Sequence, residues 1–144
     1  MGVELVEKKD WSALMGTSSV DYHWKYTSIS SDREGWEKVL LVIKAVDEVS
    51  GRLSIYVRGP YSNEKEYGDI GAKLLDNAGK LSEMAEELVK DENYSGDISA
   101  YIGDGCVKLG FQIVAVGGYI DFFVEGPEDA AKFVSTVIKK ALDE

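Results

Sequence analysis

The chain has 144 residues, 44% of them hydrophobic and 10% aromatic, which is enough apolar material for one packed domain and unlike a disordered polar chain. The 16 Lys and Arg against 26 Asp and Glu give a net charge of −10. A charge of that sign repels the phosphate backbone of nucleic acids and the anionic surface of membranes. We therefore expect a single domain over residues 1–144 whose partner is neither a nucleic acid nor a membrane.

The cysteine content and the first residues indicate a cytoplasmic protein. Cys106 is the only cysteine, so no disulfide can form within the chain, and a lone thiol suits a reducing compartment. Residues 1–9 contain acidic side chains and no long apolar run, unlike a signal peptide. No stretch of the chain approaches the roughly 18 apolar residues of a membrane span.

The N-terminal part is expected to begin with strands. Val3 suggests a first strand, and Asp10 is placed to cap a short helix after it. Residues 20–29 alternate between two kinds of side chain, which predicts a strand with one buried face. One side of this strand carries Tyr22, Trp24 and Tyr26, and the other carries His23, Lys25 and Thr27. The polar residues 30–35 are expected to form a turn.

The apolar run at residues 39–43 fits either a helix or a strand. Its β-branched content favours a strand, and so does the turn around Gly51, which leads directly into a second apolar run at residues 53–57. A glycine in a short turn between two such runs is typical of a β-hairpin. We expect residues 39–43 and 53–57 to form two strands of such a hairpin.

The clearest helix is expected over residues 70–90, after a polar loop at residues 61–67. Apolar residues recur there at steps of three and four, namely Ile70, Leu74, Leu75, Ala78, Leu81, Ala85 and Leu88. This spacing places them on one face of a helix, while the charged residues lie mostly elsewhere.

The sequence of the last third of the chain predicts three short strands. They are expected at residues 98–102, 107–116 and 119–124. A tight turn at residues 103–105 joins the first two, and a two-residue hairpin turn at Gly117 and Gly118 joins the second and third.

A final helix is expected after these strands. Pro127 suits its first turn, because the proline ring presets the helical φ angle. Glu128 and Asp129 match the positive end of the helix dipole, and Lys139 and Lys140 match its negative end. The apolar stripe of this helix consists of Ala130, Phe133, Val134, Val137, Ile138, Ala141 and Leu142.

Two segments of the chain match at a constant offset of 67. Residues 49–60 (VSGRLSIYVRGP) resemble residues 116–127 (VGGYIDFFVEGP), and the offset makes the two prolines equivalent. A duplication would divide the domain into two βββα halves, residues 18–92 and 96–144. Two unrelated units can also converge on these residues, because hairpins and helix starts both favour Gly and Pro. In either case we expect an α+β fold, an antiparallel sheet with helices on one face.

In the order of its expected elements alone, the chain also resembles the small acidic secretion chaperones. A short helix near the N-terminus would make that order αβββαββα, which is the alternative to a duplicated βββα unit. The resemblance implies a dimer that binds unfolded segments of a client protein.

The spacing of reactive residues predicts no catalytic residue, no metal and no other cofactor. His23 is the only histidine, and nothing in the sequence joins it to Cys106 or to carboxylates as a triad or a zinc site would require. We expect His23 at the surface or edge of its strand and Cys106 as a small, half-buried apolar residue. The glycine-rich turns match neither a dinucleotide-binding fingerprint nor a P-loop.

A sheet with helices on one face leaves its other face partly exposed, and aromatic residues are enriched at binding surfaces. The candidate binding residues are therefore aromatic: Tyr22, Trp24 and Tyr26 on one strand, or Tyr56 and Phe123 on two others. We hypothesise a non-enzymatic protein- or peptide-binding module that acts as a homodimer. The alternative is a small-ligand-binding protein or an enzyme with a pocket at the junction of the two halves.

Overall fold

The structure, a computed structural model, describes residues 2–11, 19–49, 52–58, 64–66, 95–103, 105–114 and 116–143; for residues 32, 52–58, 64–66 and 95–98 it describes the backbone only. The strands are β1 (Val3–Asp10), β2 (Ser19–Thr27), β3 (Arg52–Arg58), β4 (Glu64–Glu66), β5 (Ser95–Ile102), β6 (Gly105–Val114) and β7 (Tyr119–Pro127). The described helices are α2 (Asp32–Val49) and α5 (Glu128–Leu142). The helices expected directly after Asp10 and over residues 70–90 fall outside the described residues.

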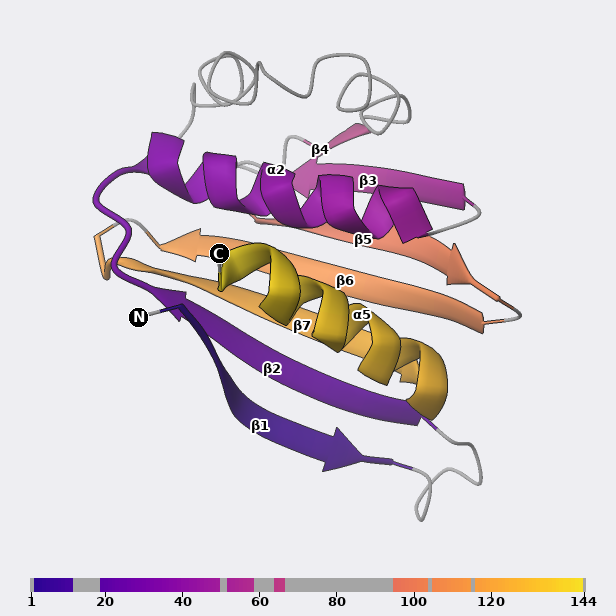
Figure 1. The fold of residues 1–144 in the computed structure, drawn as a ribbon. Helices are drawn as coiled ribbons and strands as arrows, with labels where there is room; N and C mark the ends of the chain where they lie inside the picture. Colours follow the sequence, from indigo (N-terminus) through magenta and orange to yellow (C-terminus); the bar gives the residue numbers. More distant parts are fainter. Residues whose placement is uncertain are drawn as a thin grey trace.

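The strands form one sheet in the order β1-β2-β7-β6-β5-β3-β4, and every neighbouring pair is antiparallel. Helices α2 and α5 lie next to each other across one face of this sheet (Figure 1). Helix α2 packs on β5 and β6, and α5 packs mainly on β7 and β2. The expected α+β class, an antiparallel sheet with helices packed on one face, is confirmed.

Helix α2 corrects the assignment of residues 30–43. The prediction of a strand at residues 39–43 is wrong, because these residues belong to an 18-residue helix. Its buried apolar side chains recur at helical steps and pack toward the sheet: Trp36, Val39, Leu40, Val42, Ile43 and Val46. Composition favoured a strand, but this spacing gives a helix one continuous buried stripe.

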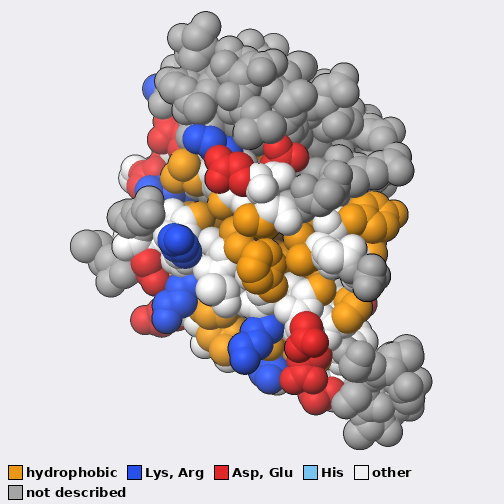
Figure 2. Space-filling view, turned by 45° about the vertical axis from the view of Figure 1, so that its right-hand side comes forward, with side chains coloured by type: hydrophobic (Ala, Val, Ile, Leu, Met, Phe, Trp, Pro, Cys, Tyr) orange, Lys and Arg blue, Asp and Glu red, His pale blue; other side chains and the backbone are white. Residues whose placement is uncertain are grey.

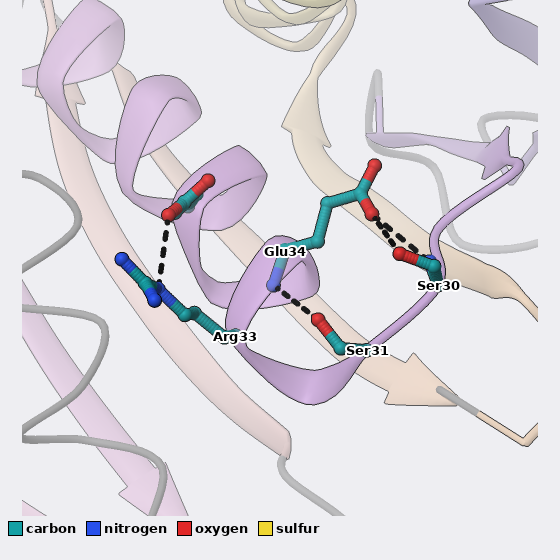
Figure 3. Close-up of polar contacts among 5 residues, drawn as sticks. Ser30, Ser31, Arg33 and Glu34 are labelled. Carbon is teal, nitrogen blue, oxygen red and sulfur yellow. Dashed lines mark hydrogen bonds and ion pairs between the residues drawn. The ribbon is translucent and has the colours of Figure 1, made fainter.

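The residues expected to form only a turn contain the start of α2. The Glu34 N–H donates a hydrogen bond to Ser31 Oγ (3.1 Å), as in a helix N-cap. The Ser30 N–H and hydroxyl both donate to Glu34 Oε2, at 3.0 and 2.6 Å (Figure 3). This reciprocal pattern is a variant of the capping box, whose Ser-x-x-Glu signature is present at residues 31–34.

The strand assignments in the last third are confirmed, with one change in a turn. Strands β5 and β6 are joined by a two-residue turn, in which Gly103 has a φ of 57°, a value that favours glycine. The β6–β7 hairpin exists, but Val114 pairs with Tyr119, so its loop has four residues rather than the expected two. Helix α5 begins directly after Pro127 and carries the expected charges at both ends.

The structural likeness of the two matching segments is limited to single strands. Strands β3 and β7 begin at residues 52 and 119, which preserves the offset of 67. The segment before β3 is helix α2, whereas the segment before β7 is the β5–β6 hairpin. A first half of the form βββα is therefore wrong. The order αβββαββα is also wrong, since helix α2 stands between β2 and β3, where that order has consecutive strands.

The core lies between the sheet and the two helices. Alternate residues of β2, β6 and β7 point into it, among them Val20, Leu109 and Phe122. Inside it, the indole N–H of Trp24 donates to Ser135 Oγ of α5 at 3.1 Å, which ties β2 to that helix. In the part of the chain that is described, no helix has both the length and the apolar content needed to cross a membrane.

Candidate functional site

The aromatic side chains of β2 lie on the covered face of the sheet. Tyr22 and Trp24 are buried in the core, and Tyr26 is partly buried against it. The expectation that these three could form the open face is wrong, because α5, more than 100 residues later in the chain, packs on their side of β2. The side chain of Tyr56 lies outside the described residues.

Phe123 is the predicted aromatic residue that the structure places on the open face. It lies on β7 with 44% of its surface exposed, between the buried residues Phe122 and Val124. Its ring stacks on the imidazole of His23 from β2, with a centroid distance of 4.5 Å and an interplanar angle of 18°. His23 and Phe123 are directly paired in the β2–β7 register, so the stack is a cross-strand pair.

A carboxylate holds the His23 ring in this orientation. Nε2 of His23 lies 2.8 Å from Asp121 Oδ1, also on the open face of β7. Cys106 does not join this pair: it lies exposed on β6, contrary to the expected half-buried position, because strand alternation buries Val107 instead. Among the described residues, no group of three His, Cys, Asp or Glu could hold a metal ion.

A groove of about 360 Å³ lies around the stacked pair and is called the open-face groove below. Four neighbouring strands line it: Glu7 and Lys9 of β1, residues 21–23 of β2, Lys108 and Gly110 of β6, and residues 123–125 of β7. Sequence analysis missed most of these residues because they come from four separate strands. The alternation in β2 did contain one usable signal, since it places Asp21 on the same side as His23.

The charges of the open-face groove have both signs. Lys9 Nζ lies 3.7 Å from Glu7 Oε1, and both side chains are about half exposed. Asp21 and Glu125 face each other directly in the β2–β7 register, and Lys108 faces Glu125 from the other side. Asp21 Oδ2 accepts a hydrogen bond from the Trp11 indole at 2.6 Å.

A second hollow of about 480 Å³, called the helix groove below, runs between α2 and α5. Its apolar lining residues are Leu41, Ala45, Val49, Phe133, Val137 and Ala141, and its charged ones are Lys44, Glu48 and Lys140. Phe133 is 45% exposed although it belongs to the predicted apolar stripe of α5. In the space-filling view, hydrophobic side chains gather on the helix-bearing side with charged residues around them (Figure 2).

Comparison with known proteins adds no relative: no protein-family model matches the chain, and no curated protein and no solved structure matches it.

Proposed function

We propose that the chain is a non-enzymatic protein- or peptide-binding module that acts as a small acidic homodimer in the cytoplasm. The partner binds on the open face of the sheet, in the open-face groove. The observation that carries this proposal is the exposed ring of Phe123 stacked on His23 inside that groove. An aromatic side chain that is held in one orientation and left exposed is typical of binding hot spots.

The groove offers the other features of a binding surface as well. Its aromatic centre has a rim of Glu7, Lys9, Lys108 and Glu125, and polar rims around apolar centres are usual at protein interfaces. The net charge of −10 favours the approach of basic partners, chiefly by raising the association rate.

The homodimer is proposed to form through the helix groove. Phe133 and Val49 are exposed there, and burying them against a second copy would remove apolar surface from water. In a two-fold dimer each copy contributes the same patch, so Glu48 of one copy can lie opposite Lys44 or Lys140 of the other. This location leaves the open-face groove free for the partner.

A small ligand bound in the open-face groove is the second candidate function. The His23–Asp121 pair at 2.8 Å favours it, because such a pair can donate or accept a proton near a bound molecule. Against an enzymatic use, the described residues that line the groove include no cysteine, serine or threonine that could act as a nucleophile.

Selection from a random peptide library displayed on phage tests the proposed function. The immobilised chain should enrich peptides, and replacing Phe123 with Ala should weaken their binding by about tenfold or more, measured by fluorescence polarisation. Tyr101→Ala is the matched control, because Tyr101 is also an exposed aromatic residue of the sheet but does not line the groove. Failure to enrich any peptide, or equal losses in both variants, would contradict the proposal.

A further inference from the structure

We propose that the open-face groove is a receptor for an arginine side chain of the bound partner. This inference rests on the proposed peptide binding and names the chemistry that the groove recognises. Three features carry it: an aromatic ring with one free face, a pair of opposed carboxylates next to it, and the lack of an ion pair to one of those carboxylates among the described residues.

The free ring face results from the strand register. His23 of β2 covers Phe123 from one side, and on the other side the residue paired with Phe123 is Gly110 of β6. Because glycine has no side chain, nothing from that position covers the second face of the ring. A flat guanidinium group can lie above Gly110 against this face, where the ring quadrupole attracts a cation.

The opposed carboxylates form the next cross-strand pair on the same face of these two strands. Glu125 and Asp21 are directly opposite each other, two residues from the Phe123–His23 pair, which corresponds to about 7 Å along a strand. Like charges directly opposite in an antiparallel pair repel each other. A cation placed between them removes this repulsion, and the planar fork of an arginine suits two carboxylates at once.

Asp21 is the carboxylate of this pair that has an unpartnered oxygen. One of its oxygens accepts a hydrogen bond from the neutral Trp11 indole, and its Oδ1 is buried with no hydrogen-bond partner. Lys108 faces Glu125 in the β6–β7 register. Lys9 faces Asp21 in the β1–β2 register, but its ammonium lies 3.7 Å from Glu7 Oε1 and forms its ion pair there. A guanidinium that reaches the groove therefore meets a carboxylate that no cation of the groove already occupies.

The same features favour arginine over other ligands. A lysine ammonium is a compact, strongly hydrated charge that gains less from the flat ring face than a guanidinium does. An anion would meet three carboxylates, those of Glu7, Asp21 and Glu125, against two lysines. The net charge of −10 adds a long-range attraction for any cation.

Titration of the full-length chain with N-acetyl-arginine amide, followed by ¹H–¹⁵N NMR, tests the proposal. N-acetyl-citrulline amide, which has nearly the same shape without the charge, and N-acetyl-lysine amide are the matched ligands. We expect arginine amide to shift the resonances of His23, Gly110 and Phe123 and to bind at least about fivefold more tightly than either control. Equal binding of the citrulline compound would overturn the proposal.

Isosteric variants locate the site. Asp21→Asn and Glu125→Gln should each weaken the binding of N-acetyl-arginine amide by about threefold to tenfold. Glu128→Gln, which changes an exposed acid at the start of α5, should leave this affinity unchanged. Asn at position 21 can still accept the Trp11 hydrogen bond, so this variant should fold. Unchanged binding in both groove variants would also sink the proposal.

The two proposals fail in different ways. If phage selection enriches peptides that depend on Phe123 but lack arginine, the binding module stands and the arginine receptor is refuted. If arginine amide binds with the expected dependence on Asp21 and Glu125 while no peptide is enriched, the receptor stands and the peptide-binding function is refuted.

Discussion

At the scale of single residues, Ser30, Ser31 and Glu34 decide where α2 begins. Ser31 Oγ accepts from a backbone N–H of the first turn, which has no partner within the helix. Glu34 in turn accepts from the backbone and hydroxyl of Ser30 (Figure 3). These bonds explain why a segment with a polar, turn-like composition starts a long helix.

The stability that Glu34 contributes should depend on pH. Both hydrogen bonds from Ser30, the one from its side chain first, lower the pKa of Glu34 below its usual 4.5 because they favour the ionised carboxylate. The contribution is therefore complete above pH 4.5 and is lost as the pH falls through the lowered pKa of the folded state. Glu34→Gln should reduce the free energy of unfolding at neutral pH and have a smaller effect in acid.

Urea unfolding of the unchanged chain and of the Glu34→Gln variant over a pH series measures the difference between their free energies of unfolding. Asp47 works in the opposite direction, since burial and then the charge of Glu48 raise its pKa, so its protonation in acid favours the folded state. Asp47 is present in both proteins, and its effect cancels in the difference between them. A difference that stays constant from neutral pH into acid would show that Glu34 does not act through its charge.

At the scale of elements, the contact between α2 and the sheet requires a glycine. A Cβ added to Gly35 would lie 2.6 Å from Cγ2 of Ile113 on β6 and 3.3 Å from Cδ1 of Ile29. Ile113 is fully packed in the core and has little room to move. The close approach at Gly35 therefore fixes how deeply the first turn of α2 sits on β6.

Gly35→Ala should destabilise the protein although alanine is the better helix former. Helix propensity favours Ala by about 1 kcal/mol, but overpacking of a core contact costs about 1–3 kcal/mol, so we expect a net loss. Lys132→Ala, at an exposed position of α5 outside the helix groove, is the control and should change stability by less than about 0.5 kcal/mol. Chemical denaturation distinguishes the outcomes, and a gain in stability for Gly35→Ala would refute the close packing.

At the scale of the whole molecule, the chain presents two different unpaired surfaces on opposite sides. The helix side carries the mostly apolar helix groove, and the far side of the sheet carries the charged open-face groove with its aromatic centre. Burial of apolar surface drives stable association between copies, whereas charges mainly affect the encounter with a partner. This division supports assigning self-association to the helices and partner binding to the sheet.

Light scattering should therefore give a mass near twice 15.8 kDa, and this mass should persist at high salt. Salt screens the repulsion between two copies that each carry a charge of −10, and it does not weaken apolar contacts. Phe133→Ser should shift the mass toward that of a single chain, while Tyr101→Ser should not. A single-chain mass at all concentrations would contradict the homodimer.

Part of the fold could be predicted because some signals are local. The alternation in β2, the Gly103 turn and the paired charges of α5 each act within a few residues, and the structure agrees with all three. Residues 39–43 were ambiguous, because a short apolar run suits a buried strand as well as a helix. The capping signature at Ser31 and Glu34 was the local signal that could have settled the matter.

Less of the candidate site was predictable. Phe123 and His23 stood out individually as an aromatic residue and the only histidine, but they lie 100 positions apart in the sequence. Gly110 and Glu125 had no feature that distinguished them from other glycines and acids, and Asp21 was marked only by lying on the same side of its strand as His23. Their roles follow from the register of three strands, which the sequence of this chain does not reveal.

The sequence by itself determined the charge of the chain, the existence of a two-sided strand within residues 20–29 and the mixture of helix and antiparallel sheet, because these depend on composition and short-range periodicity. Only the tertiary structure decided that α5 covers Tyr22 and Trp24 while Phe123 stays exposed. The physical reason is that strand alternation separates two faces without saying which one a distant helix will bury. That choice depends on apolar contacts formed between segments far apart in the chain.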